Sequence, residues 1–173
     1  HMGFILLAFM AGSIGSTAGL YYAITYALMA AAGFGILMVL SNDNIECEEI
    51  KDLAGLNQRH AWFALLMLLV MFSMAGIPPL MGFYAKFGVI MVLLKFHYVW
   101  LSVFAVVMSL IGAFYYLRVV KVMYFDEPTH DQPIGSNYAA KFFLSVNAFL
   151  LVLWGVMPQT MIDWCAKALE NTL

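Results

Sequence analysis

The sequence predicts an all-α integral membrane protein, a polytopic bundle of transmembrane helices. Hydrophobic residues make up 64% of its 173 residues and charged residues 10%, with a mean hydropathy of +0.89, whereas a soluble domain carries roughly 25% charged residues. The apolar runs are continuous and rich in Leu, Met, Ala and Phe, without the alternation of membrane strands. This composition excludes a soluble domain. The few, scattered basic residues argue against a nucleic-acid partner.

The N-terminal third predicts one partial and one complete helix. Residues 1–11 form an apolar run of about ten residues, half of the roughly 20 needed to span a bilayer. A turn of small residues is expected at 12–17, and the first complete span at 18–40. The acidic segment 41–60 is expected to be a polar loop in water. Within it, four apolar residues recur at intervals that predict a short amphipathic surface helix. These residues are Ile45, Ile50, Leu53 and Leu56.

Two apolar segments meet at a proline pair. The first, 61–77, ends there because proline lacks an N–H and disfavours helical geometry in the residue before it. The second, 80–94, would be only about 22 Å long. Glycines flank the prolines, so we expect a broken or re-entrant helix, with the break at Gly76, Pro78, Pro79 and Gly82.

The C-terminal part predicts two further spans, at 101–124 and 140–157. A polar loop at 125–139 separates them, and an amphipathic tail is expected at 159–173. We therefore expect one membrane domain over residues 1–173, with five full spans. With five spans, basic residues would be nearly balanced between the two sides of the membrane, so the positive-inside rule would not assign an orientation.

Lys86 is the strongest candidate functional residue, because it lies inside the apolar run from Met74 to Phe87. A helix starting after Pro79 would place it roughly 9 Å from one end and 12 Å from the other. An ionisable group at such a depth is expensive and usually functional. Burial penalises the charged form of an amine, so Lys86 could act as a proton relay. The alternative is a lysine that only caps carbonyl groups at the break or reaches toward the interface.

Other polar residues could extend a proton path, although most hydroxyls in membrane helices bond only to nearby backbone. The candidates are His1, Tyr22, Thr25, Tyr26, Ser73 and Ser109. No catalytic triad, phosphate loop or metal-spaced His/Cys cluster appears in the sequence, and Cys47 and Cys165 suggest neither a disulfide nor a metal site. We expect no cofactor and no metal in this chain.

Several motifs together identify a family. They are Asp52–Leu56 followed by Arg59, the stretch Leu65–Phe87 around the proline pair, His1–Phe4, Tyr22-x-x-x-Tyr26 with Gly33–Gly35, Phe114–Arg118 and Trp154–Pro158. This pattern resembles the antiporter-like, proton-translocating membrane subunits of respiratory complex I, NADH-quinone oxidoreductase, and it covers essentially the whole chain. One departure is His60-Ala61, where the family usually has a proline two residues after the arginine.

The resemblance implies the C-terminal part of a fourteen-helix subunit, holding most of the second of two inverted repeats and the final helix. Lys86 falls on the family's lysine in the second broken helix, which is thought to exchange protons with the exit half-channel. The resemblance also implies a multi-pass protein of the bacterial inner membrane. Its partners would be other complex I membrane subunits, the N-terminal part of the same subunit and lipid. Flavin, iron–sulfur clusters and quinone would lie elsewhere in the complex.

Three further functions stay open from the sequence. The chain could be a structural membrane scaffold in which Lys86 only satisfies backbone groups. It could also be a cation/proton antiporter subunit of the same superfamily, or a carrier for another cation.

Overall fold

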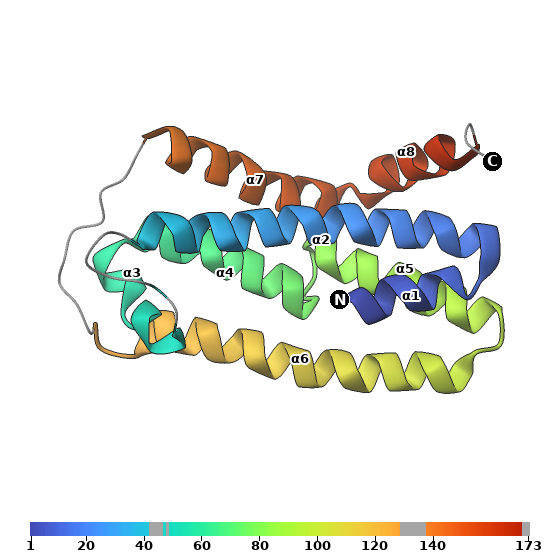
Figure 1. Cartoon of the computed structure of the whole chain (residues 1–173), viewed down its shortest axis with the longest axis horizontal. Helices are drawn as coiled ribbons and strands as arrows, with labels where there is room; N and C mark the ends of the chain where they lie inside the picture. The colour runs from blue at the N-terminus through green and yellow to red at the C-terminus, as the bar shows by residue number, and fades with distance from the viewer. Residues whose placement is uncertain (42–46, 48, 129–137, 171–173) are drawn as a thin grey trace.

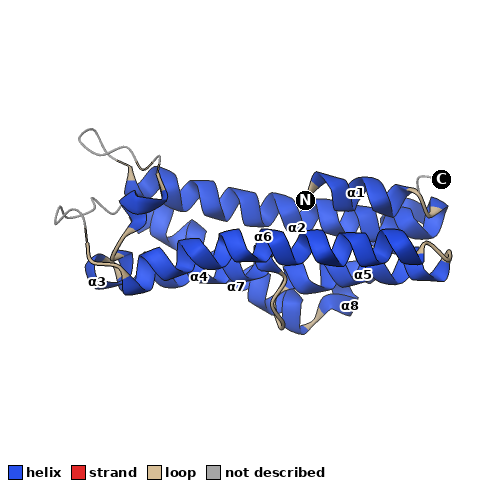
Figure 2. Ribbon diagram, turned by 90° about the horizontal axis from the view of Figure 1, so that it is seen from below, coloured by secondary structure: helices blue, strands red, loops and turns tan. Residues whose placement is uncertain are grey.

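The chain folds into an elongated bundle of helices that share a common long axis (Figures 1 and 2). The computed structural model describes residues 1–41, 47, 49–128 and 138–170, and all regular structure within these residues is helical. The elements are α1 (Met2–Phe9), α2 (Gly12–Leu40), the 3₁₀ helix η1 (Ile50–Leu53), α3 (Leu56–Arg59), α4 (Ala61–Ala75), α5 (Met81–Lys95), α6 (Val99–Phe125), α7 (Tyr138–Val156) and α8 (Pro158–Glu170). The all-helical class is confirmed. α2 lies at the centre and packs against α1, α4, α5, α7 and α8.

Three helices in the described part of the chain are long and apolar enough to cross a membrane, within α2, α6 and α7. α4 and α5 have 15 residues each, about 22 Å at 1.5 Å per residue, which is less than the roughly 30 Å of the hydrocarbon core. Figure 1 shows them one after the other along α2, each beside one half of it. The prediction of five full spans is therefore not confirmed, because each of these two helices is shorter than the hydrocarbon core and the two lie end to end along α2.

The turn expected at 12–17 is wrong, since α2 already begins at Gly12. The chain reverses just before it, and Gly12 has a φ of +63°. The small residues instead allow α1 to fold back onto α2. A Cβ at Gly15 would overlap the carbonyl oxygen of Ala8, so only glycine lets the two backbones approach this closely.

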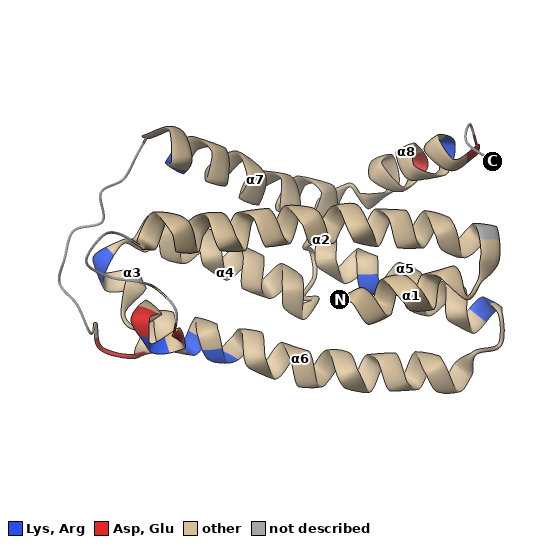
Figure 3. Ribbon diagram, in the orientation of Figure 1, with Lys and Arg blue, Asp and Glu red and all other residues tan. Residues whose placement is uncertain are grey.

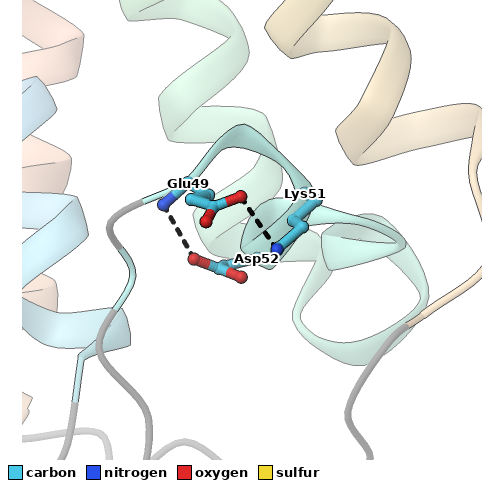
Figure 4. Close-up of polar contacts among 3 residues, drawn as sticks. All are labelled: Glu49, Lys51 and Asp52. Carbon is cyan, nitrogen blue, oxygen red and sulfur yellow. Dashed lines mark hydrogen bonds and ion pairs between the residues drawn. The ribbon is translucent and has the colours of Figure 1, made fainter.

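The polar segment before α4 contains two short helical elements rather than one amphipathic helix, and Ile45 lies outside the described residues. η1 is capped by its own side chains (Figure 4): the Glu49 N–H donates to the Asp52 carboxylate at 2.8 Å, and Lys51 pairs with Glu49 at 2.8 Å. Leu53 and Leu56 are buried. The apolar side chains therefore anchor this segment to the bundle while its charged groups remain exposed.

Basic residues gather at one end of the bundle (Figure 3). The Gly55 N–H donates to the Val122 carbonyl oxygen at 3.2 Å, and the Lys141 ammonium lies 5.8 Å from the Trp62 ring centroid, so η1 and α3, the end of α6 and the start of α7 meet there. η1 and α3 carry Lys51 and Arg59, the C-terminal part of α6 carries Arg118 and Lys121, and the start of α7 carries Lys141. Lys95 ends α5 and Lys167 lies in the last turn of α8, and both of these helix ends lie at the opposite end of the bundle (Figure 1). The basic residues are therefore distributed unevenly between the two ends of the bundle, unlike the nearly balanced distribution expected from five spans, because α4 and α5 lie one after the other along α2 (Figure 1).

The C-terminal segment forms the amphipathic helix expected at 159–173, as far as the described residues extend. Pro158 is the first residue of α8, a position where its missing N–H costs nothing. Met161 and Cys165 face the bundle, while Gln159 and Asp163 share an exposed hydrogen bond of 2.9 Å. One helical face is thus buried and the other polar.

Gly155 on α7 lies directly against the break between α4 and α5. A Cβ there would overlap the Pro79 carbonyl oxygen and lie 2.7 Å from Leu80 backbone carbon. We expect Gly155→Ala to lower the free energy of unfolding by about 1–3 kcal/mol, because backbone must shift to admit the methyl group. Thermal unfolding of the purified full-length protein in detergent measures this.

Gly112→Ala is the matched control, since a Cβ at that helical position meets nothing within 4 Å in the described residues. It should be neutral or stabilising by up to about 1 kcal/mol. Equal effects of the two substitutions would contradict close packing at Gly155.

Candidate functional site

The end of α4 is closed by backbone hydrogen bonds around a left-handed glycine. Gly76 has a φ of +89°, its N–H donates to the Ser73 carbonyl at 3.0 Å, and the Ile77 N–H donates to the Phe72 carbonyl at 3.0 Å. This pair of bonds is the Schellman arrangement. Pro78 and Pro79 follow and have no N–H to donate. The carbonyl groups of Met74 and Ala75 are therefore left to find donors outside the helix.

Lys86 of α5 supplies those donors. Its Nζ donates to the carbonyl oxygens of Met74 at 2.9 Å and Ala75 at 3.0 Å, and to Ser109 Oγ on α6 at 2.9 Å. An ammonium has three N–H donors, so all three are used. Lys86 is 9% exposed. Its charge also lies at the negative end of the α4 dipole, where a cation is stabilised.

The two glycines of the break make room for different contacts. A Cβ at Gly76 would lie 3.1 Å from Lys86 Cδ and 3.4 Å from its Nζ, so glycine admits the lysine. The Gly82 N–H donates to Ser73 Oγ at 3.1 Å, and a Cβ on Gly82 would overlap the Ser73 carbonyl oxygen. Gly82 thus lets the start of α5 lie against the end of α4.

A second polar cluster surrounds His1. Its Nδ1 lies 2.8 Å from the Tyr22 hydroxyl and its Nε2 lies 3.0 Å from the Tyr116 hydroxyl, while its ring stacks on Tyr26 with centroids 5.0 Å apart. In a neutral imidazole one nitrogen donates and the other accepts. The cluster therefore joins the start of the chain to α2 and α6 through a group that can carry a proton on either nitrogen.

Phe4 contacts one member of each cluster. The Lys86 ammonium lies 5.9 Å from the Phe4 ring centroid, within the range of a cation–π contact. The same ring stacks on Tyr22, with centroids 5.5 Å apart. Phe4 therefore links the two clusters through contacts of its apolar ring.

The structure brings some of the predicted path residues together. His1, Tyr22 and Tyr26 share one cluster, and Lys86 and Ser109 share the other. Ser73 lies at the break, where it bonds Gly82. Thr25 donates to the Tyr21 carbonyl of its own helix at 2.8 Å, so its hydroxyl is used within α2. The roles of these residues in proton transfer remain predictions.

Sequence reasoning missed Tyr116 and Phe4. Tyr116 follows Ser109 by seven residues, about two turns, so both lie on one face of α6. That spacing could have singled it out. Phe4 carries no comparable signal, because an aromatic residue in an apolar helix is common and its contacts with both clusters are set by tertiary packing.

Comparison with known proteins places the chain in a family. The model described as "NADH:quinone oxidoreductase/Mrp antiporter, TM" matches residues 1–112. The chain belongs to this family of membrane proteins. Proteins named NADH-quinone oxidoreductase subunit N are 80% identical in Neisseria gonorrhoeae and 48% identical in Nitrosomonas europaea, each over 100% of this chain. The chain spans 36% of the length of both relatives.

Solved structures agree with this assignment. A chain of respiratory complex I from Thermus thermophilus with bound aureothin matches 93% of this chain and 36% of its own length, with a TM-score of 0.81 and 25% identity. A chain of the Mrp complex from Dietzia sp. matches 98% of this chain and 40% of its own, with a TM-score of 0.80 and 20% identity. The latter likeness shows the fold alone.

Ser73→Ala tests the bond between the two half-helices. Removing the hydroxyl leaves the buried Gly82 N–H without its acceptor, and we expect unfolding free energy to fall by about 1–3 kcal/mol. Thermal unfolding of the full-length protein is again the measurement. Ser16→Ala is the control, because the exposed Ser16 hydroxyl donates to the Gly12 carbonyl of its own helix; it should change stability by less than about 0.5 kcal/mol. If Ser73→Ala left the free energy of unfolding unchanged, this would contradict a stabilising hydrogen bond from the Gly82 N–H to Ser73 Oγ.

Proposed function

We propose that this chain is part of a membrane subunit of NADH:quinone oxidoreductase and contributes to proton translocation, with Lys86 as a residue that takes up and releases a proton in the exit half-channel. The observation that carries the proposal is the buried amine at the helix break, held on three sides by α4 and α6. Family membership and the relatives named subunit N support it.

The hydrogen bonds around Lys86 suit both of its protonation states. As an ammonium, it donates to the Met74 and Ala75 carbonyls and to Ser109. As a neutral amine it keeps two donors and gains one lone pair. A hydroxyl both donates and accepts, so Ser109 can rotate and donate to that lone pair. Loss of the proton would then leave no carbonyl at the break without a donor.

Other subunits of the complex would carry out the redox chemistry. Quinone reduction, with flavin and iron–sulfur clusters, would take place in other subunits, and its energy would reach Lys86 as a change in local electrostatics. The partners would be neighbouring membrane subunits, the remainder of the same subunit and lipid. The location would be the bacterial inner membrane.

One observation favours a second candidate, a structural scaffold. The same three hydrogen bonds would cap α4 even if Lys86 never released its proton, and two unsatisfied carbonyls inside a membrane bundle would be costly. A cation/proton antiporter subunit of the same superfamily is a third candidate, supported by the family model. Dependence of transport on sodium in vesicles would favour it.

Lys86→Gln distinguishes the relay from the scaffold, because a glutamine amide can still donate two hydrogen bonds but cannot take up a proton at physiological pH. In membrane vesicles carrying the full-length subunit, we expect the complex to assemble normally while the number of protons pumped per NADH oxidised falls. Lys86→Met, which removes the donors as well, should give the same pumping defect together with reduced stability.

Native gels verify assembly before pumping is compared. Wild-type proton stoichiometry in an assembled Lys86→Gln complex would exclude the relay. If Lys86→Met then lowered only the amount of complex, the scaffold would be supported.

The distribution of basic residues also supports an orientation. The end of the bundle with five basic residues should face the cytoplasm, because Lys and Arg are retained on that side. Lys51 and Lys95 lie at opposite ends and are both exposed. In a full-length protein without its own cysteines, a membrane-impermeant maleimide should label Lys51→Cys in inverted vesicles and Lys95→Cys in right-side-out vesicles. The reverse pattern would contradict the orientation.

A further inference from the structure

The His1 ring bridges two helices that pack mainly against other neighbours. α6 packs mainly against α4 and α5, whereas α2 packs against α1, α4, α5, α7 and α8. Nδ1 of His1 lies 2.8 Å from the Tyr22 hydroxyl on α2, and Nε2 lies 3.0 Å from the Tyr116 hydroxyl on α6. Tyr26 stacks on the ring, with the two planes inclined by 28°. The ring is therefore held at both nitrogens and on one face.

The directions of the two hydrogen bonds depend on each other. A neutral imidazole has one N–H that donates and one bare nitrogen that accepts, and a hydroxyl can do either. The nitrogen that carries the proton is therefore set by the hydrogen bond at the other nitrogen. Either Tyr22 donates to Nδ1 while Nε2–H donates to Tyr116, or both bonds run in the reverse direction.

Burial separates these two arrangements, because the tyrosines differ in exposure. Tyr22 is 1% exposed, and its hydroxyl bonds His1 Nδ1. If Tyr22 accepted from Nδ1–H instead, its own O–H would lose this acceptor while buried, and buried polar groups nearly always have a partner. Tyr116 is only half-buried, so its O–H can turn away from the ring while its oxygen accepts from Nε2–H. The arrangement in which Tyr22 donates is therefore the favourable one.

Tyr116 also relates His1 to the helix that contacts Lys86. Tyr116 follows Ser109 by seven residues on one face of α6. Ser109 Oγ accepts a hydrogen bond from Lys86 Nζ at 2.9 Å. A proton on Nε2 therefore points toward the same helix face that accepts one of the Lys86 hydrogen bonds.

We propose that Tyr22 and Tyr116 are positioning residues that hold neutral His1 in its Nε2–H tautomer, with the ring proton directed at Tyr116 on the α6 face shared with Lys86. Tyr22 fixes the bare Nδ1, and Tyr116 fixes the nitrogen that carries the proton. This inference rests on the proposed function, because it orients His1 for proton exchange in the same translocation.

Nitrogen-15 NMR of histidine in the full-length protein in bilayers tests the tautomer, with His1→Asn identifying the His1 signals. At a pH where the ring is neutral, we expect Nε2 to be protonated and Nδ1 to be bare. Tyr116→Phe removes the acceptor of Nε2–H and should shift the tautomer ratio about two- to tenfold toward Nδ1–H, the effect of one hydrogen bond. Tyr22→Phe leaves that acceptor in place, so Nε2–H should remain the main form.

Tyr115→Phe is the matched control. Tyr115 is 54% exposed, and the ring that contacts Tyr116 is kept in phenylalanine. It should leave both the tautomer ratio and proton pumping unchanged. A wild-type ring protonated mainly on Nδ1, or a wild-type ratio in Tyr116→Phe, would overturn the positioning role.

Proton pumping separates this inference from the proposed function. In an assembled complex, Tyr116→Phe should lower the rate of pumping about two- to tenfold. Wild-type pumping in Tyr116→Phe, together with a loss in Lys86→Gln, would reject the role of Tyr116 and leave the proposed function intact. Wild-type pumping in Lys86→Gln would instead reject the relay, whereas the NMR measurement decides the tautomer without reference to pumping.

Discussion

The hydrogen bonds from Lys86 to the carbonyl oxygens of Met74 and Ala75 make an interrupted helix possible inside an apolar bundle. A proline pair ends α4 and leaves carbonyl groups without helical donors. Each such group costs several kcal/mol in a membrane when unpaired. A side chain from the next half-helix satisfies both groups, and its charge is stabilised by the dipole that it caps. The break therefore explains why a lysine can be buried here, and the lysine explains how the break is stabilised.

The neighbouring helices are arranged around this contact. Ser109 brings α6 to the third donor of the lysine, Gly82 lets α5 overlap the end of α4, and Gly155 brings α7 against Pro79. A change in the protonation of Lys86 would thus affect the contacts of four helices at once, namely α4, α5, α6 and α7. The apolar ring of Phe4 contacts both this centre and the His1 cluster, through Lys86 and Tyr22.

Much of this could be predicted from the sequence, for local reasons. The helical class follows from composition, and the break from the glycines and prolines between residues 76 and 82. Lys86 is conspicuous because it is charged within an apolar run. Other features depend on tertiary packing. The sequence shows two short apolar segments around the prolines but not that they lie end to end along α2, and this placement brings most of the basic residues to one end of the bundle. The small residues at 12–17 predict a turn, whereas they begin α2, because the close packing of Gly15 against Ala8 leaves no local signal in the sequence.

The central claim is that one amine both closes the break and exchanges a proton without opening it. Nitrogen-15 NMR of lysine side chains in the full-length protein in bilayers tests this directly, with Lys86→Gln identifying the Lys86 signal. The account predicts that the Lys86 Nζ resonance moves reversibly between its charged and neutral positions as pH rises, while the backbone signals of Met74 and Ala75 remain those of the folded state. A Lys86 signal that stays charged until those backbone signals are lost would contradict the account and leave the lysine as a structural cap.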